Sequence, residues 1–137
     1  MPPSTHPRTF LLCALALGAG FVAPNASAQT PHPQVRAYVA QAGTAPRPAM
    51  GERFFTTTHG REWSCASCHG QRPITPGRHA GTGKAIGALA PSANPNRFTD
   101  TAKTEKWFRR NCNDVLGREC TAGEKADVLA WLLGLSS

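Results

Sequence analysis

Residues 65–69 read Cys65-Ala66-Ser67-Cys68-His69, and Cys-x-x-Cys-His is the attachment motif of c-type haem. Two thiols in this spacing can each add to one vinyl group of a haem, which holds the macrocycle covalently. The imidazole of His69, which follows directly, is then placed to bind the iron as its proximal ligand. The motif therefore predicts one covalent haem c, bound through Cys65, Cys68 and His69, with the chain folded around it.

Residues 1–28 have the composition of a secretory signal peptide. Arg8 lies in a short basic segment, an apolar run over 10–22 follows, and Ala26-Ser27-Ala28 has the small residues of a cleavage site. The apolar run is too short to span a membrane as a helix, so we expect no stable membrane anchor. We expect a mature domain over 29–137 in the periplasm, because haem c is attached outside the cytoplasm.

The cysteines predict a disulfide bond. Cys13 falls within the expected signal peptide, and the haem takes Cys65 and Cys68, which leaves Cys112 and Cys120. An oxidising compartment favours a disulfide between these two over a pair of buried free thiols. Closing so short a loop stabilises a fold by about 2 to 4 kcal/mol.

The chain has 137 residues and a formal net charge of +7. This length suits one small domain. The hydrophobic core of such a domain is small, so the fold usually needs an additional stabilising element such as a buried haem. The basic surface either steers an acidic redox partner or simply belongs to a generic soluble protein. No basic stripe is interleaved with aromatic residues, so nucleic-acid binding is not expected.

Four segments have the periodicity and end signals of helices: 33–42, 48–57, about 100–112, and a last one that begins after Thr121. Asp100 or Thr101 is a suitable N-cap for the third helix, and Thr121-Ala122-Gly123-Glu124 forms a capping box for the last. We expect the last helix to bury Val128, Leu129, Leu132 and Leu133, and the third helix to place Phe108, Cys112 and Val115 on one side. The first helix places Val35, Tyr38 and Val39 on one side, and the second carries Phe54 and Phe55. Helices at both ends of the chain predict the all-α architecture of a class I cytochrome c.

Glycines and prolines recur through the stretch from Gly70 to Asn96 and exclude a long regular element there. Such a long loop is uncommon in a small domain unless it wraps a ligand. We expect this loop to wrap the edge of the haem.

The sixth ligand of the iron is the open question. Electron-transfer cytochromes c of this architecture usually use a methionine from beyond the motif, but Met1 and Met50 both precede it. Downstream donors are His79, several lysines and several asparagines. A histidine or lysine would bind firmly and keep the iron a low-spin electron carrier. An asparagine carboxamide is a weak, neutral ligand that could leave on reduction and open a gas-binding site. From the residues alone, His79 and the asparagines remain equally open.

The second half of the chain carries a more specific signal. It resembles the sphaeroides haem protein (SHP) family of small periplasmic monohaem cytochromes c, most densely from Lys84 to Leu132. The matching residues are Leu89-Ala90-Pro91-Ser92-Ala93-Asn94-Pro95-Asn96-Arg97-Phe98-Thr99-Asp100, Lys106-Trp107, Arg110-Asn111-Cys112-Asn113, Gly117-Arg118-Glu119-Cys120-Thr121 and Gly123-Glu124-Lys125-Ala126-Asp127.

The resemblance implies His69 as the proximal ligand, Asn111 as the distal ligand, and a disulfide between Cys112 and Cys120. It also implies that the asparagine leaves the iron on reduction and that the ferrous haem binds oxygen or nitric oxide. The implied electron donor is a dihaem or other c-type cytochrome. An electron carrier or gas-binding haem protein is favoured over an enzyme, and redox activity on oxygen or nitric oxide stays open. The alternative is a plain electron shuttle with a fixed sixth ligand from His79 or a lysine.

Phe98 and Trp107 are candidates for lining the haem pocket. Aromatic residues at helical spacing are more often part of the core, so core positions are the default prediction for Trp107 and for Trp131.

Two rival interpretations use the same motif. Zinc could be held by Cys65, Cys68, His69 and His79, although zinc does not explain the export signal or the resemblance. A thioredoxin-like redox motif is weaker still, because no βαβ pattern surrounds the cysteines.

Overall fold

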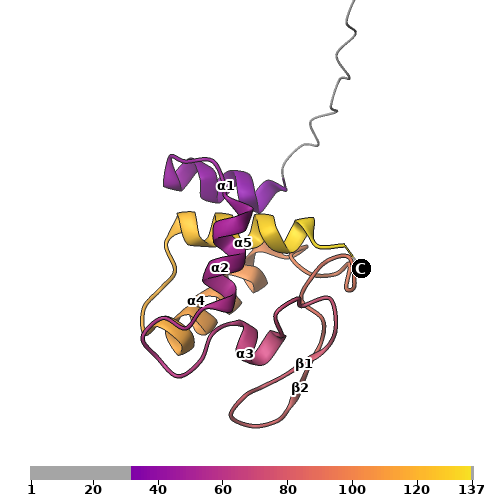
Figure 1. Ribbon diagram of the computed structural model, residues 1–137. Coiled ribbons are helices and arrows are strands. Elements are labelled where there is room, and N and C mark those ends of the chain that lie inside the picture. The colour runs from indigo at the N-terminus through magenta and orange to yellow at the C-terminus, as the bar shows by residue number, and fades with distance from the viewer. Residues whose placement is uncertain (1–31, 137) are drawn as a thin grey trace, which may run out of the picture.

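The structure, a computed structural model, describes residues 32–136. The predicted signal peptide and its cleavage site lie outside these residues. In chain order the elements are α1 (Pro33–Ala42), α2 (Pro48–Thr56), α3 (Ala66–His69), β1 (Gly77–Arg78), β2 (Ala85–Ile86), α4 (Thr101–Leu116) and α5 (Ala122–Gly134) (Figure 1). The predicted small helical domain is confirmed.

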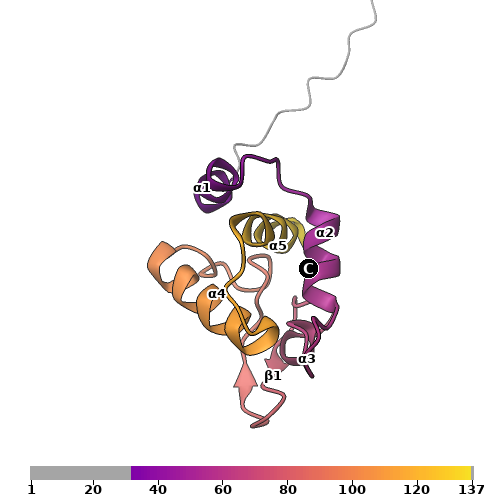
Figure 2. The ribbon, with the colours of Figure 1, turned by 90° about the vertical axis from the view of Figure 1, so that its left-hand side faces the viewer.

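The helix α5 is the centre of the fold. Figure 2 views it nearly end-on, with α1, α2 and α4 arranged around it. One cluster of buried residues joins α2, α3 and α5, and consists of Phe55, Ala66, Val128, Trp131 and Leu132. A second joins α1 to α5, and consists of Val35, Tyr38, Ala126 and Leu129. Phe98 and Phe108 pack against both clusters, so the segment that leads into α4 is tied to the whole core.

The helix ends follow the signals in the sequence. The Asp100 carboxylate accepts a hydrogen bond from the backbone N–H of Lys103 at 2.9 Å, which caps α4. Thr121 and Glu124 form the predicted capping box at the start of α5. These side chains satisfy backbone groups that a helix end otherwise leaves without partners.

The end of α4 differs from the prediction. The helix continues past Cys112 to Leu116 and stops where Gly117 adopts a left-handed conformation with φ of 74°. A left-handed residue ends a helix, and glycine adopts this conformation without steric cost. Asn111 therefore lies inside α4 rather than at its end, so its backbone is held by the helix.

The glycine- and proline-rich stretch is irregular except for the short antiparallel pair of β1 and β2. The carbonyl oxygen of Pro73 accepts hydrogen bonds from the backbone N–H groups of Leu89 and Ala90, each at 3.0 Å. At Gly77 the loop approaches the attachment motif so closely that a Cβ would lie 2.1 Å from the carbonyl oxygen of Cys68. The loop is thus folded back onto α3.

Trp107 and Trp131 differ in burial. Trp131 is buried, as predicted, whereas Trp107 is 42% exposed, so the prediction that it joins the core is wrong. The guanidinium of Arg110 lies over the Trp107 ring, 5.5 Å from its centre, in a cation–π contact. Within residues 32–136, every helix falls short of the length and apolarity needed to cross a bilayer.

Candidate haem site

The attachment motif forms one short helix, α3. The backbone N–H groups of Cys68 and His69 both donate to the carbonyl oxygen of Cys65, at 3.3 and 3.1 Å. Residues three apart are neighbours on a helix surface, so this turn brings the two thiols to one side. Both cysteines are free and half-buried. Burial raises the pKa of the Cys65 thiol to about 11, and the neighbouring Cys68 contributes in the same direction.

His69 ends this short helix with its ring 6.1 Å from the ring of Phe55. Burial, and secondly the positive charge of Arg97, lower the pKa of His69. The imidazole is therefore neutral at physiological pH, which is the form that binds a metal. No side-chain hydrogen bond joins either ring nitrogen to another residue of the described chain.

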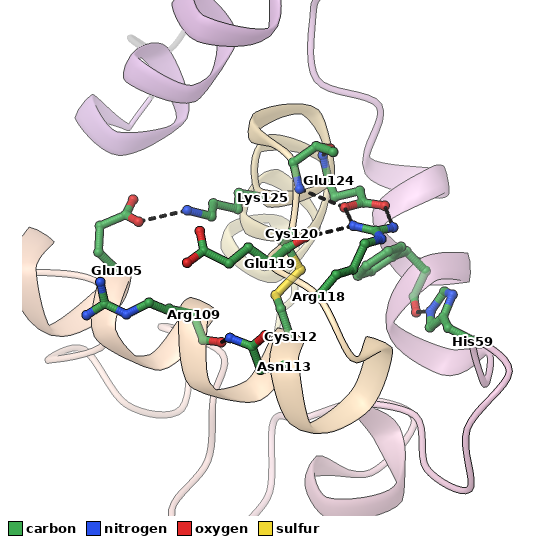
Figure 3. The surroundings of a disulfide bond; sticks show 12 residues. His59, Glu105, Arg109, Cys112, Asn113, Arg118, Glu119, Cys120, Glu124 and Lys125 are labelled. Atoms are coloured by element: carbon green, nitrogen blue, oxygen red, sulfur yellow. Dashed lines mark hydrogen bonds and ion pairs between the residues drawn. A yellow bond between two sulfur atoms is a disulfide. The ribbon is translucent and has the colours of Figure 1, made fainter.

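Asn111 lies on the inner side of α4. It is half-buried. It shares a helix face with Thr104, Phe108 and Val115, because residues three, four or seven positions apart lie on the same side of a helix. Its carboxamide has no hydrogen-bond partner within residues 32–136. The nearby Asn113 differs, because its side chain is exposed and donates to the carbonyl oxygen of Arg109 at 2.8 Å (Figure 3).

The predicted disulfide between Cys112 and Cys120 is confirmed. Their Cα atoms are 5.6 Å apart, and both residues are buried (Figure 3). The bridge ties the residue next to Asn111 to the loop before α5. In that loop the guanidinium of Arg118 binds both carboxylate oxygens of Glu124, at 2.8 and 2.6 Å. The helix α4 is thus cross-linked close to Asn111.

His79 is engaged in its own turn. Its Nδ1 accepts hydrogen bonds from the backbone N–H groups of Gly81 and Thr82, both at 3.2 Å, and its ring lies 6.3 Å from that of Trp63. A nitrogen that accepts hydrogen bonds carries no proton, so the proton of the neutral ring must be on Nε2. In this state neither nitrogen has a free lone pair for a metal.

The described chain gathers no group of three or more His, Cys, Asp or Glu side chains that could hold a metal ion. The zinc site considered for Cys65, Cys68, His69 and His79 is therefore not formed. The thioredoxin-like interpretation also finds no support, because the sheet described here is only the pair of two-residue strands.

A cavity of about 490 Å³ lies beside the motif. Residues 60–63, which lead into α3, and Asp114, three residues after Asn111, line it. Its lining includes neither the two thiols nor His69 nor Asn111. The two free thiols and the neutral imidazole of α3 are a donor set that fits a covalently attached haem, and the carboxamide on α4 is a candidate further donor.

Arg97 was not among the predicted site residues. Its guanidinium donates to the carbonyl oxygens of Ala88 and Gly87, and its charge acts on His69. The available signal was its position inside the matching stretch 89–100, next to Phe98. Of the two predicted pocket residues, Phe98 is half-buried and packs on the core, and Trp107 is exposed.

Comparisons with known proteins identify the family of the chain. A family model described as "Domain of unknown function (DUF1924)" matches residues 41–132. The cytochrome c-type protein SHP of Cereibacter sphaeroides is 44% identical over 129 residues, which cover 91% of this chain and 96% of that protein. Cytochrome c'' of Methylophilus methylotrophus is 48% identical over 81 residues, which cover 59% of this chain and 56% of that protein.

Solved structures show the same relationship. The structure of oxidised SHP, an oxygen-binding cytochrome c, matches with a TM-score of 0.70 and 46% identity over 74% of this chain and 94% of that one. Oxidised cytochrome c'' matches with a TM-score of 0.66 and 39% identity over 76% of this chain and 93% of that one. The chain belongs to the DUF1924 family and is a monohaem c-type cytochrome related to SHP and cytochrome c''.

Proposed function

We propose that this chain is a periplasmic cytochrome that receives electrons and, once reduced, binds oxygen, nitric oxide or another small ligand. The attachment residues would be Cys65 and Cys68, the proximal ligand His69, and the distal ligand Asn111. When bound, haem supplies an iron that exchanges one electron and can hold a small molecule on its distal side.

The observation that carries this proposal is the unpartnered carboxamide of Asn111. Since the half-buried carboxamide of Asn111 has no partner in the described chain, no contact within the protein has to break before its oxygen can bind a metal. Asn113 is two residues away in the same helix, but its side chain is exposed and its amide nitrogen donates to the carbonyl oxygen of Arg109. Of these two asparagines, Asn111 is the one that is half-buried and shares a helix face with core residues.

A carboxamide oxygen suits a ligand that must leave. It is neutral and hard, so it is better matched to ferric than to ferrous iron. Because α4 continues to Leu116 and Cys112 is bridged to Cys120, the backbone at Asn111 has little freedom. Detachment would therefore be a rotation of the Asn111 side chain rather than a movement of the chain.

The alternative sixth ligands fit less well. His79 would have to give up both hydrogen bonds to its turn and move its proton before it could bind iron. Lys125 is paired with Glu105 at 2.8 Å, and the other lysines downstream of the motif, Lys84, Lys103 and Lys106, are exposed. The hydrogen bonds of His79, the ion pair of Lys125 and the exposure of the other lysines support Asn111 as the sixth ligand.

The relatives support the same function. SHP is described as an oxygen-binding cytochrome c, and a solution structure of cytochrome c'' is described in terms of haem-ligand detachment. The predicted signal peptide supports a periplasmic location. The formal net charge of +7 suits an acidic electron donor, for which a dihaem or other c-type cytochrome is the proposed class.

The test is Asn111→Ala, with Asn113→Ala as the matched control and His79→Ala as the rival. We expect Asn111→Ala to change the ferric absorption spectrum from six-coordinate to an open form, and the other two variants to leave it unchanged. In the unsubstituted protein, the ferrous spectrum should change when carbon monoxide is added. A ferric spectrum that responds to His79→Ala and not to Asn111→Ala would overturn the assignment.

A further inference from the structure

The outward side of α4 carries a stripe of positive charge. Lys103, Lys106 and Arg110 are exposed, and they follow one another at intervals of three and four residues, which places them on one side of the helix. Lys103 and Lys106 form no ion pair within residues 32–136. Arg110 lies 3.9 Å from Asp114, but both side chains are more than half exposed, so water screens this pair and the stripe stays basic.

The carboxylate in the first half of α4 is turned away from this stripe. Glu105 accepts a hydrogen bond from the hydroxyl group of Tyr38 in α1. It also forms an ion pair with Lys125 of α5, at 2.8 Å (Figure 3). The charge of Glu105 is therefore matched by the neighbouring helices and does not offset the stripe.

An exposed tryptophan lies beside the stripe. Trp107 is 42% exposed, and the guanidinium of Arg110 lies over its ring. Among the large apolar residues within residues 32–136, it shares this exposure only with Met50 of α2. Tryptophan and arginine are among the residues that most often dominate the binding energy of protein interfaces. Asn111 follows Trp107 by four residues, so this surface borders the part of α4 that carries the candidate distal ligand.

We propose that Lys103, Lys106, Trp107 and Arg110 form the docking surface for a redox protein that presents a carboxylate-rich face. This inference rests on the proposed function and deepens it, because it names the surface chemistry of the electron donor and the face of this chain that receives it. Complementary charge speeds the encounter of two proteins and fixes their orientation. The indole ring and the guanidinium beside it supply contact area that charge alone does not give.

Two other occupants fit this surface less well. A second copy of this chain would bring the same positive charges face to face, which is unfavourable. A membrane requires a row of apolar side chains that enter the lipid, and the exposed side of α4 offers Trp107 alone within the described chain. A folded acidic partner needs neither self-complementary charge nor an apolar row.

The test measures binding to oxidised plant-type ferredoxin, an acidic one-electron redox protein that serves as the probe. We expect Lys106→Glu in the haem-loaded protein to raise the dissociation constant about tenfold at about 0.01 M salt, where charges act over roughly 30 Å. The effect should shrink at about 0.1 M salt, where charges act over roughly 10 Å. Lys103→Glu, one turn away, should behave in the same way.

Arg53→Glu is the matched control. It changes the net charge by the same amount, but Arg53 is an exposed residue of α2, which lies on the other side of α5 from α4 (Figure 2). We expect it to raise the dissociation constant by less than about threefold. An effect as large as that of Lys106→Glu would show that net charge alone attracts the probe, and would overturn the proposal.

Trp107→Ala tests the apolar part of the surface. We expect binding about fivefold weaker at both salt concentrations, because salt does not screen an apolar contact. An unchanged affinity would remove Trp107 from the docking surface. Binding to vesicles of anionic phospholipid that Lys106→Glu abolishes, with ferredoxin binding unaltered, would overturn the choice of a protein partner.

A second readout separates this inference from the proposed function. The rate at which reduced ferredoxin reduces the haem-loaded protein should fall in Lys106→Glu together with the affinity. A ferric spectrum that ignores Asn111→Ala would overturn the proposed ligand and leave the docking surface intact. Affinity and rate that ignore both lysine substitutions would overturn the docking surface and leave the assignment of Asn111 intact.

Discussion

Gly51 in α2 lies directly against the carbonyl oxygen of Asp127 in α5, and a Cβ added at Gly51 would be 2.1 Å from that oxygen. The same aspartate also holds the residue just before α2, because its carboxylate accepts a hydrogen bond from the backbone N–H of Arg47 at 2.7 Å. Asp127 thus contacts α2 through its backbone carbonyl group and binds the residue before α2 through its carboxylate.

Gly51→Ala should therefore destabilise the fold by about 2 to 3 kcal/mol, the usual cost of overpacking a closely packed contact. Urea unfolding at neutral pH measures this loss. The control is Gly134→Ala in α5, where an added Cβ meets no atom, and it should change the free energy of unfolding by less than about 1 kcal/mol. Equal effects of the two substitutions would show that α2 and α5 do not cross this closely.

Removing the disulfide by the double substitution Cys112→Ala and Cys120→Ala should lower the free energy of unfolding by about 2 to 4 kcal/mol. Since the bridge holds the backbone next to Asn111, we also expect faster and less ordered detachment and return of the distal ligand. Stopped-flow absorbance after reduction measures these rates. Gly51→Ala serves as a destabilised control with the bridge intact, and identical rates in all three proteins would refute the idea that the bridge acts as a tether.

Stability at low pH should depend on Glu124. Hydrogen bonding from Arg118 is the main reason that the pKa of Glu124 is lowered from its ordinary value near 4.5. A lowered folded-state pKa contributes stability that is present above pH 4.5 and is lost as the pH falls through the folded-state value. Glu124→Gln should therefore flatten the dependence of the unfolding midpoint on pH below about 5, whereas substitution of the exposed Glu119 by Gln should not.

Tyr38 is the only tyrosine of the chain, so its ionisation can be followed alone. Burial, followed by its hydrogen bond to Glu105, raises the pKa of Tyr38. Tyrosinate absorbance should therefore appear only when alkali unfolds the protein, and an earlier titration would contradict the buried contact. Tyr38→Phe should cost about 1 to 2 kcal/mol in urea unfolding, because Glu105 loses a donor.

The sequence allowed the local elements to be predicted well, because their signals lie within a few residues of each other. The capping box of Thr121 and Glu124 and the N-cap of Asp100 are such signals, and both are present in the structure. The disulfide could be predicted because only two cysteines remained after the haem motif was recognised. The end of α4 was placed too early, although Gly117 was the signal that would have marked it.

What the sequence alone determined is the chemistry: two thiols and an imidazole in one short segment, a cysteine pair, and a set of candidate distal donors. Folding decided which donors are available, since His79 accepts hydrogen bonds from its own turn and Asn111 has no partner in the described chain. It also decided that Trp107 is exposed. Helical periodicity shows which residues share a face, but only the packing of α4 and its preceding loop against distant segments determines what that face meets.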